Sequence, residues 1–573
     1  MMAKRIEYDV LFVGGGVASL SAAHRLVDLA KQNNASVRIG VLEKGKDFGA
    51  HVLSGAVSNP RSVKKLFPDY ETNGFPLEGK CAQSNVTILG RKKAWDMPSF
   101  FAPPELNKTG YLILSLSEVC RWMAANLHEK VKETPSIVVD LYTGFAGQEI
   151  LYDGNRVAGV RVDSTGNAEN DNCYAKVTVF GDKMFLSRDL YAKFNLTPTP
   201  QTWAVGVKEV WETEKDLSGK VWHTIGFPLL DGSFGGGFIY GLKDKKLAIG
   251  MVTGLDSDNP ALRPPQILQS LKKHPWVQEM LKGGKIVKYG ASLIPEGGYY
   301  SLPREFAVDG AMVVGDALGV LDVKGFSGVD KAMETGMTAA ETLFAAVQKK
   351  DYSAATLGAY KQALMDGWVG QELKKSRYYR WAFHENKKLF SDYLPTVVNG
   401  LDDANIYAGG VSAFLSGPAG LIGSALDLKK LMDGGTEIGP VQWKDDRTNT
   451  KPDFKAKPLA EPDGFVKGTV YSTADVVFYA NTHYHHGNAH ITEFNAEACK
   501  RCIGRYHGSG NEVPCAGDCT AEVHEVREKD GVKYHFMNLE NCVQCRTCEI
   551  VCPEKNLRVN GAEHGSGPDF TGL

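Results

Sequence analysis

The feature that most constrains this chain is a dense group of cysteines near its C-terminal end. Of the 11 cysteines in 573 residues, eight fall between positions 499 and 552. The last four are separated by two, two and three residues and precede a proline: Cys542, Cys545, Cys548 and Cys552. In bacterial ferredoxins, cysteines with this spacing bind iron–sulfur clusters, and the fourth binds the neighbouring cluster of a two-cluster domain. The sequence therefore predicts an iron–sulfur domain.

Further cysteines upstream supply the ligands that a second cluster needs: Cys499, Cys502, Cys515 and Cys519. If the fourth ligands cross over, each cluster receives four thiolates. The first set is then Cys519, Cys542, Cys545 and Cys548, and the second set is Cys499, Cys502, Cys515 and Cys552. The twelve residues between Cys502 and Cys515 exceed the compact spacing, so we expect an inserted loop there. Zinc is the alternative, because tetrahedral four-cysteine sites use similar cysteine pairs.

Length and composition describe an ordinary globular protein of several domains. A chain of 573 residues is too long for one compact core. Lys and Arg (65) nearly balance Asp and Glu (67), which gives a net charge of −2 and no reason to expect a nucleic-acid partner. No signal segment precedes the first predicted strand, so secretion and a disulfide framework are not expected.

The N-terminal segment has the pattern of a dinucleotide-binding βαβ unit. Residues 8–13 form an apolar run typical of a buried parallel strand, residues 17–30 have helical spacing, and residues 37–42 form a second strand. Gly14 would allow the tight turn after the first strand. Gly16 would let the backbone approach a pyrophosphate at the helix N-terminus.

Two further residues complete this fingerprint. Ser19 takes the place of the third glycine and is small enough for close packing of the helix on the strand. Glu43 follows the second strand, where a carboxylate can accept both hydroxyls of an adenosine ribose. A purely structural glycine-rich turn is the alternative, but the strand, helix and acid in register favour a nucleotide.

A second element favours FAD as that nucleotide. Residues 310–316 form a short strand that ends in Gly315 and Asp316, ahead of a helix predicted over residues 326–349. In flavoproteins with two dinucleotide-binding motifs, this aspartate binds the ribityl chain and the helix N-terminus faces the flavin. A helix N-cap is the simpler alternative for Asp316.

The middle of the chain mixes strands and helices, as expected for an α/β nucleotide domain interrupted by a second domain. Strands are predicted at residues 177–180, 247–252 and 312–314, and a further helix at 354–379. The expected domains are, in order, an α/β FAD domain interrupted by an inserted α+β domain (1–443), a linker rich in Lys, Pro and Asp (444–463), and a ferredoxin-like domain (464–573).

Several long blocks resemble the electron-transfer flavoprotein:quinone oxidoreductase family. They lie at residues 49–56, 201–211, 223–228, 289–298, 541–548 and 565–573. The resemblance implies electron-transfer flavoprotein as the donor, FAD, and a quinone that enters from the membrane through the inserted domain. It also implies quinone contacts at Gly235 and Gly236, and one [4Fe–4S] cluster on the first set. The expected FAD-binding residues are Gly14, Gly16, Ser19, Glu43, Gly55, Gly315 and Asp316.

The second set departs from the mitochondrial members of this family, which have one cluster. Two clusters resemble the ferredoxin-like subunit of electron-bifurcating flavoprotein complexes, here fused to the quinone-reducing flavoprotein, so the partner can be simple or bifurcating. We expect electrons to pass from the partner through two [4Fe–4S] clusters and FAD to the quinone. No catalytic side chain is assigned, because the cofactors carry the chemistry. The alternatives are an isoprenoid double-bond-reducing flavoenzyme and a non-catalytic relay subunit.

Contact with a membrane is expected at its surface. Residues 404–426 are free of charge but are interrupted by glycine, proline and serine, so they are not expected to span a bilayer. Together with the aromatic residues 95–104 they suit the shallow insertion of a monotopic protein. We expect the cytoplasmic face of a prokaryotic inner membrane, with the mitochondrial inner membrane as the alternative.

A histidine-rich segment at residues 483–490 has no assigned role. Its four histidines, His483, His485, His486 and His490, can bind metal. A loop that packs against a cofactor, or is simply solvated, explains them as well.

Overall fold

The computed structural model describes residues 7–573 with gaps. The gaps are residues 56, 99–101, 164–170, 387–390, 392–393, 396–397, 399–438, 444–456, 458, 460, 463–467, 486–489 and 563. The charge-free segment at 404–426 lies outside the described residues, as does most of the linker predicted over 444–463.

An eight-stranded sheet organises the N-terminal half of the molecule. Its strands are β1 (Glu7–Val13), β2 (Val37–Glu43), β8 (Ile137–Thr143), β9 (Ala146–Asp153), β10 (Arg156–Asp163), β11 (Asn172–Phe180), β17 (Ala307–Val308) and β18 (Ala311–Val313). The main path runs β17-β18-β11-β1-β2-β8, and the neighbours from β18 to β8 pair in parallel. This parallel order with β1 at its centre is the dinucleotide-binding architecture that the first strands predicted.

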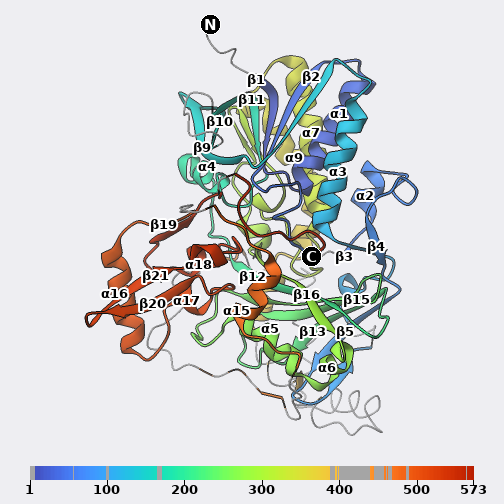
Figure 1. Ribbon diagram of the computed structural model, residues 1–573. Coiled ribbons are helices and arrows are strands. Elements are labelled where there is room, and N and C mark those ends of the chain that lie inside the picture. The colour runs from blue at the N-terminus through green and yellow to red at the C-terminus, as the bar shows by residue number, and fades with distance from the viewer. Residues whose placement is uncertain are drawn as a thin grey trace.

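Three long helices pack against this sheet (Figure 1): α1 (Val17–Gln32), α3 (Leu116–Val131) and α7 (Val329–Lys349). Helix α1 buries Leu20, Leu26 and Val27 on one apolar face. It approaches α7 very closely, because a Cβ added at Gly336 would lie only 2.1 Å from the Ala18 carbonyl oxygen. The glycine is therefore required by the contact between the two helices.

The helix predicted over residues 354–379 is broken into short pieces. The observed helices are α8 (Ala354–Leu357), α9 (Ala359–Asp366), α10 (Trp368–Lys375) and α11 (Tyr379–Glu385). Two of the breaks fall at Gly358 and Gly367, and glycine is among the poorest helix formers. The apolar periodicity therefore located the helical region but missed its interruptions.

A second sheet of seven strands is formed mostly by the chain between β11 and β17. Its strands are β5 (Gln83–Leu89), β6 (Ala94–Asp96), β12 (Trp203–Glu212), β13 (Lys220–Gly226), β14 (Gly235–Gly241), β15 (Lys246–Gly254) and β16 (Lys285–Pro295), in the order β16-β12-β15-β14-β13-β5-β6. Helices α5 (Pro264–Lys273) and α6 (Pro275–Leu281) accompany it. The chain leaves the first sheet and returns to it, which confirms the inserted α+β domain.

A fully buried ion pair joins the inserted sheet to α5. The Lys272 ammonium lies 2.8 Å from a Glu209 carboxylate oxygen, and neither side chain is exposed. Gln269 donates to the other carboxylate oxygen at 2.9 Å. Each charge is thus partnered, as burial requires.

Smaller elements connect the two sheets. They are β3 (Val57–Ser58), β4 (Leu77–Lys80), β7 (Leu112–Leu114), α2 (Arg61–Leu66) and α4 (Ser187–Phe194). Strands β3, β7 and β4 form a small antiparallel sheet.

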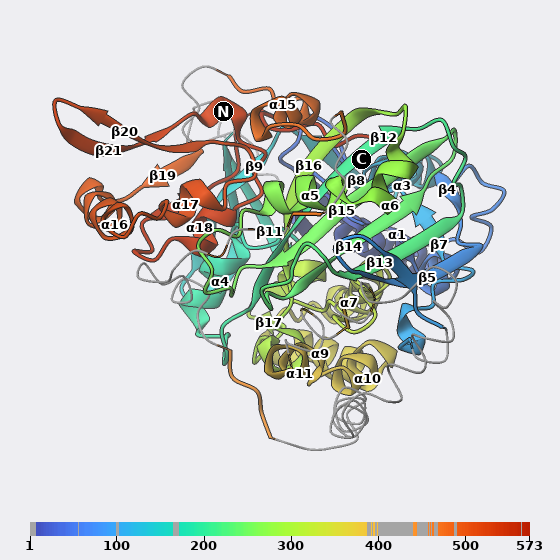
Figure 2. The same cartoon turned by 90° about the horizontal axis from the view of Figure 1, so that it is seen from below.

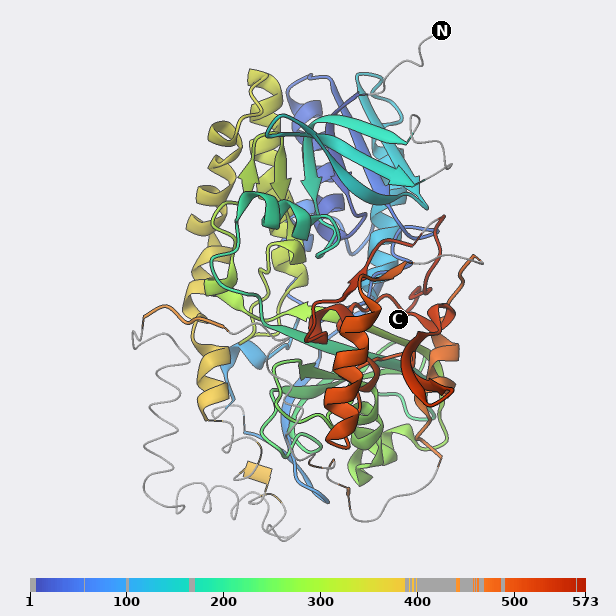
Figure 3. The same ribbon diagram turned by 90° about the vertical axis from the view of Figure 1, so that its left-hand side faces the viewer.

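The cysteine-rich domain lies beside both sheets (Figures 2 and 3). Its elements are α15 (Thr473–Val477), β19 (Ile491–Glu493), α16 (Ala496–Gly508), α17 (Pro514–Gly517), β20 (His524–Lys529), β21 (Val532–Met537), α18 (Thr547–Val551) and β22 (Leu557–Val559). Strand β19 pairs with β22, and β20 pairs with β21. The domain contacts α4, beside the first sheet, through an ion pair between Arg188 and Glu549. It contacts the second sheet through a 2.6 Å hydrogen bond from the Tyr289 hydroxyl to the Thr520 carbonyl.

The C-terminal tail returns to the first domain (Figure 1). The Phe570 N–H donates to the Ala50 carbonyl at 2.7 Å, and the Gly572 N–H donates to Ser117 Oγ at 3.1 Å. Leu573 is buried. The last residues therefore hold the cysteine-rich domain against the nucleotide-type sheet.

Candidate flavin, quinone and iron–sulfur sites

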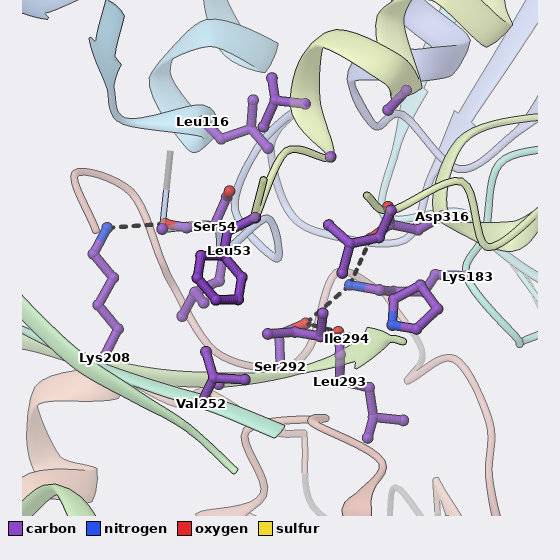
Figure 4. Close-up of a pocket in the computed structure, with 18 of the residues that line it drawn as sticks. Leu53, Ser54, Leu116, Lys183, Lys208, Val252, Ser292, Leu293, Ile294 and Asp316 are labelled. Carbon is purple, nitrogen blue, oxygen red and sulfur yellow. Dashed lines mark hydrogen bonds and ion pairs between the residues drawn. The ribbon is translucent and has the colours of Figure 1, made fainter. Parts of the chain in front are cut away.

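One cavity of about 900 Å³ connects all three regions of the molecule. Its wall includes the turn after β1 (Gly14 and Gly16), Asp316 after β18, the start of β14, and Cys545 of the cysteine-rich domain. Figure 4 shows part of this wall, with residues from the inserted sheet facing residues of the first domain. Most of the predicted nucleotide residues, both predicted quinone-contacting glycines and one thiol of the first set therefore line a common cavity.

The nucleotide end of the cavity is built by glycine backbone. Gly14 has a positive φ of 96°, and a Cβ there would lie 3.0 Å from the Gly181 carbonyl oxygen, so the turn requires glycine. A Cβ added at Gly16 would meet nothing within 4 Å, so this residue, the N-cap of α1, faces open space. Unpaired N–H groups at a helix N-terminus that opens into a cavity are suited to a phosphate.

Glu43 lies at this end and is already held by backbone donors. Its carboxylate accepts hydrogen bonds from the Gly15 N–H at 3.1 Å and the Gly45 N–H at 2.7 Å. Burial raises the pKa of Glu43, opposed by the Lys44 charge and by these two N–H groups. Each carboxylate oxygen keeps a further lone pair with which it can accept a ribose hydroxyl.

Ser19 is not part of the cavity wall. It is fully buried on α1, and a Cβ added at Gly181 would lie 2.4 Å from its Oγ. Its small size thus serves the packing of α1 against the end of β11. Gly55, by contrast, lines the cavity near the Tyr240 hydroxyl.

Asp316 does not act as a helix N-cap. It lies within a 3₁₀ turn, η3 (Gly315–Ala317), whose N-cap is Val314, while α7 begins only at Val329 after Gly328. Gly315 has a positive φ of 66° and donates its N–H to Thr335 Oγ1 at 2.9 Å. The Asp316 carboxylate faces the cavity and pairs with Lys183 at 3.0 Å.

The glycines at the start of β14 are required by their neighbouring strands. A Cβ at Gly235 would lie 2.2 Å from the Val252 carbonyl oxygen, and one at Gly236 would lie 2.6 Å from the Thr224 carbonyl oxygen. Both residues line the cavity with bare backbone. A flat ring could therefore approach this strand closely without meeting a side chain.

Apolar side chains continue the cavity wall beyond these glycines. They include Val86, Ile88, Trp95, Met97, Pro103 and Pro104. The described part of the aromatic segment at 95–104 thus lines the cavity from one side. No helix in the described part of the chain is long and apolar enough to cross a membrane.

Two buried polar residues of the inserted sheet reach the cavity and were not predicted from the sequence. His223 stacks on Phe326 with ring centroids 5.8 Å apart, and its Nε2 lies 3.4 Å from the Tyr240 hydroxyl. Burial and the Lys108 charge lower the pKa of His223 to about 3, so the ring is neutral. Lys208 donates to the Ser54 carbonyl at 3.0 Å (Figure 4). Each is a polar residue within an otherwise apolar sequence block. Such a block predicts burial, and a buried polar residue is the one signal that could have indicated a role.

The first set of thiols is held by donors of its own loops. Cys542 Sγ accepts the Gln544 N–H at 3.3 Å, Cys519 Sγ accepts the Val523 N–H at 3.2 Å, and Cys545 Sγ accepts the Thr520 hydroxyl at 3.1 Å. Burial raises the pKa of Cys548, and its charge repulsion with Cys545, Cys542 and Cys519 raises that pKa further. Grouped buried thiols of this kind are stabilised as thiolates by a metal centre.

The second set also comes together. All four of its cysteines line a small cavity of about 20 Å³: Cys499, Cys502, Cys515 and Cys552. Asn556 donates its backbone N–H to Cys552 Sγ at 3.3 Å and its side-chain amide to Cys499 Sγ at 3.2 Å. None of the described cysteines forms a disulfide. The four thiols of each predicted set therefore lie close to one another in the structure.

Two differences from the expected second set are notable. The stretch between Cys502 and Cys515, expected as a loop, is largely helical, because α16 continues to Gly508 and α17 starts at Pro514. His535 also lies near, with its Nδ1 3.8 Å from Cys499 Sγ. His535 groups with Cys515 and His524, and also with Glu493 and Cys499, in arrangements that could hold a single metal ion.

The described part of the histidine-rich segment is packed rather than clustered. His490 stacks on Tyr484 with ring centroids 4.6 Å apart, and the His483 N–H donates to the Gly567 carbonyl at 2.9 Å. Residues 486–489 lie outside the described residues. Among the described residues, the potential metal-binding groups contain neither His483 nor His490.

Two family models match parts of this chain. The model described as "ETF-QO, ubiquinone-binding" matches residues 203–294, which form most of the inserted sheet. The model described as "Electron transfer flavoprotein-ubiquinone oxidoreductase, 4Fe-4S" matches residues 469–571, which form the cysteine-rich domain.

Curated relatives match almost the whole chain. It is 32% identical over 588 residues to a mitochondrial electron transfer flavoprotein-ubiquinone oxidoreductase of Oryza sativa subsp. japonica, covering 99% of this chain and 93% of the relative. It is 31% identical over 599 residues to an electron transfer flavoprotein-ubiquinone oxidoreductase of Pseudomonas aeruginosa, covering 99% of both.

A solved structure shares the fold of the first two domains. A geranylgeranyl bacteriochlorophyll reductase-like protein from Thermoplasma acidophilum aligns with a TM-score of 0.55 and 16% identity, covering 74% of this chain and 100% of that chain. An identity this low shows a shared fold alone.

Proposed function

This chain belongs to the electron transfer flavoprotein–ubiquinone oxidoreductase family, and we propose that it oxidises a reduced electron transfer flavoprotein and reduces a quinone. It is an oxidoreductase that uses FAD and iron–sulfur. The observation that carries the proposal is the common cavity, whose wall includes Gly16, Gly235 and Cys545. Redox groups held around one cavity can exchange electrons without a diffusing carrier.

The residues at the nucleotide end fit FAD. The open N-terminus of α1, with Gly14 and Gly16, would hold the pyrophosphate, and Glu43 would accept the adenosine ribose hydroxyls. Asp316 would bind the ribityl chain, with Gly55 and Gly315 shaping the cavity and Ser19 packing α1 on the sheet. Bound FAD supplies a centre that accepts electrons singly and delivers them in pairs.

The inserted sheet fits a quinone. Gly235 and Gly236 present bare backbone, so a planar ring can approach the strand, and the apolar side chains beyond them suit an isoprenoid tail. The names of the relatives favour ubiquinone as the quinone class.

We assign two [4Fe–4S] clusters, one to each set of cysteines. The second assignment is supported by the small cavity that all four of its thiols line. Iron and acid-labile sulfide analysis with electron paramagnetic resonance on anaerobically purified protein tests it. Two clusters require about eight iron atoms per chain. Finding about four iron atoms, or zinc on the second set, would remove the second cluster and leave the rest of the proposal intact.

The donor, the location and the domain boundaries complete the proposal. The donor is an electron transfer flavoprotein, and a second cluster leaves both a simple and a bifurcating form of it open. We propose that the protein lies peripherally on the cytoplasmic face of a prokaryotic inner membrane. Its similarity to a bacterial relative, over 99% of both chains, is consistent with a prokaryotic protein. The proposed domains remain residues 1–443, 444–463 and 464–573.

Steady-state kinetics test the whole proposal. Reduced electron transfer flavoprotein should reduce a short-chain quinone analogue through this protein, with quinol formation that saturates in both substrates. An isoprenoid substrate that reoxidises the flavin while quinone does not would favour the reductase alternative. Flavin reduction without quinol formation would favour a relay subunit.

A further inference from the structure

We propose that the Lys183 side chain supplies a fixed positive charge in the flavin cavity, and that the Lys183 backbone connects this charge to the loop of the first set. The inference rests on the proposed function, because it assumes that the cavity holds FAD. It concerns a residue that neither the fingerprint nor the cysteine pattern includes.

The Lys183 ammonium lies inside the cavity between two domains (Figure 4). Its Nζ is 3.0 Å from Asp316 Oδ2, in the first domain, and 3.3 Å from Ser292 Oγ, on the inserted sheet. An ammonium has three N–H donors. Among the described residues, Asp316 and Ser292 are the only hydrogen-bonding partners of the Lys183 ammonium. The third donor is therefore available to a group bound in the cavity.

The backbone that carries this side chain is unusual. Lys183 and the next residue, Met184, both have positive φ, of 41° and 72°. A side chain disfavours this left-handed region, whereas glycine adopts it readily. Such a conformation persists only where the surroundings impose it, and it often marks a functional position.

Contacts on both sides impose the conformation. The Asp182 carboxylate accepts the N–H groups of Leu186 and Ser187, and the Met184 N–H donates to Ser187 Oγ at 3.0 Å. These bonds close the turn that leads into α4. These hydrogen bonds therefore fix the turn from which the Lys183 side chain extends into the cavity.

The Lys183 carbonyl is held from the other side by the cluster loop. Arg546, which lies between Cys545 and Cys548, donates from Nη1 to this carbonyl at 2.8 Å. Arg546 is itself buried, pairs with Glu549 at 3.0 Å, and places its guanidinium 4.3 Å from the centre of the Phe185 ring. One guanidinium thus clamps the turn to the loop that carries three ligands of the first set.

The charge would act on the flavin ring. Reduction of a flavin adds negative charge to the ring, which a nearby ammonium stabilises, and this stabilisation is large where water is excluded. Removing Lys183 would also leave the Asp316 carboxylate without its ion pair. Both effects disfavour the negatively charged ring.

Sulfite binding to the FAD-loaded protein tests this inference without turnover. Sulfite adds to oxidised flavin, leaves the ring negatively charged and bleaches its visible absorption. Lys183→Met should weaken sulfite binding roughly tenfold, which corresponds to about 1.4 kcal/mol. Lys183→Arg should stay close to the unmodified protein. Lys176→Met, which removes a lysine on β11 that pairs with Glu7 at the surface, is the matched control and should change nothing.

A glycine variant separates the charge from a purely structural role. Lys183→Gly removes the charge and relieves the backbone, so its FAD-free form should melt no lower than the unmodified protein while sulfite binding is weakened as in Lys183→Met. Unchanged sulfite binding in both variants would overturn the inference. If the unmodified protein binds FAD and sulfite but reduces no quinone, the proposed function fails while this inference stands.

Discussion

The two cysteine sets are held together in different ways. In the first set, Cys542 and Cys519 accept backbone N–H groups two and four residues further along the chain, and the loop between the ligands is left-handed at Gln544 and Arg546. In the second set, two thiols come from α16, one from α17 and one from the end of α18. The first geometry is therefore largely a property of one loop, whereas the second depends on the packing of three helices.

The two sets also differ in what surrounds them. Cys545 of the first set lines the flavin cavity, and none of the second-set thiols does so. The second set borders His535 and Asn556 instead. From this comparison we propose that the first set exchanges electrons with the flavin and that the second set exchanges electrons with the partner flavoprotein.

The largest test of this comparison removes one ligand from each set. Cys548→Ala should abolish quinone reduction and Cys502→Ala should spare the flavin and the first cluster, each with a loss of about four iron atoms per chain. Iron analysis, electron paramagnetic resonance and flavin-to-protein ratio measure these outcomes. Cys173→Ala, on β11, is the control and should keep full iron content. Unchanged iron in Cys502→Ala would end the comparison.

A second test compares arginines beside the two sets. Arg546→Met removes a buried partner of Glu549 and the clamp on Lys183, and should lower the free energy of unfolding by about 3 kcal/mol. Arg505→Met breaks a 3.6 Å pair with Glu554 in which the arginine is half-exposed, and should cost less than about 1 kcal/mol. Urea denaturation of the loaded protein measures both. Equal losses would show that the first-set loop is not specially anchored.

A third test concerns the side-chain donor to the second set. Asn556→Ala removes the 3.2 Å hydrogen bond to Cys499 Sγ but keeps the backbone bond to Cys552. A thiolate that loses a donor favours the oxidised cluster, so the midpoint potential should fall by about 60 mV for each tenfold change in the equilibrium. The first-cluster signal of the same sample is an internal control. A shift in both signals would indicate a general disturbance of the domain.

The smallest expected effect lies in the tail that docks beside the first set. Lys46→Met breaks the 2.9 Å pair with Asp569 and should lower the free energy of unfolding by roughly 0.2–1 kcal/mol at pH 7. Burial raises the pKa of Asp569, but hydrogen bonds from Thr571 and Lys46 hold it well below its usual value.

The sign of its pH dependence follows from that direction. A carboxyl with a depressed folded-state pKa contributes stability above its unfolded pKa of about 3.9, and this is lost as the pH falls further. The difference in melting temperature between Lys46→Met and the unmodified protein should therefore shrink below about pH 4. A difference that grows on acidification would contradict the assignment of this ion pair.

Much of the fold could be read from local patterns. The strands and helix around Gly14 are close to those predicted, with α1 extending to Gln32, because a buried strand followed by glycines and an apolar helical stripe is a local signal. The broken helix after Ser353 was missed, since the apolar period continues across Gly358 and Gly367. The helical extension of α16 was missed because a wide cysteine gap was expected to be a loop.

The candidate site divides in the same way. Glu43 was predicted because an acidic residue ends the second strand of the βαβ unit, and Asp316 because it follows a glycine at the end of a short strand. Lys183, His223 and Lys208 were not, because their partners are far away in the chain and only folding brings them to the cavity.

The sequence by itself determined the chemistry of this protein, because cluster ligands and dinucleotide turns depend on residue types at short, fixed spacings. Only the tertiary structure decided which thiols face the flavin cavity and which charges enter it. Those choices depend on the packing of elements from three domains, and short spacings carry no information about contacts at that range.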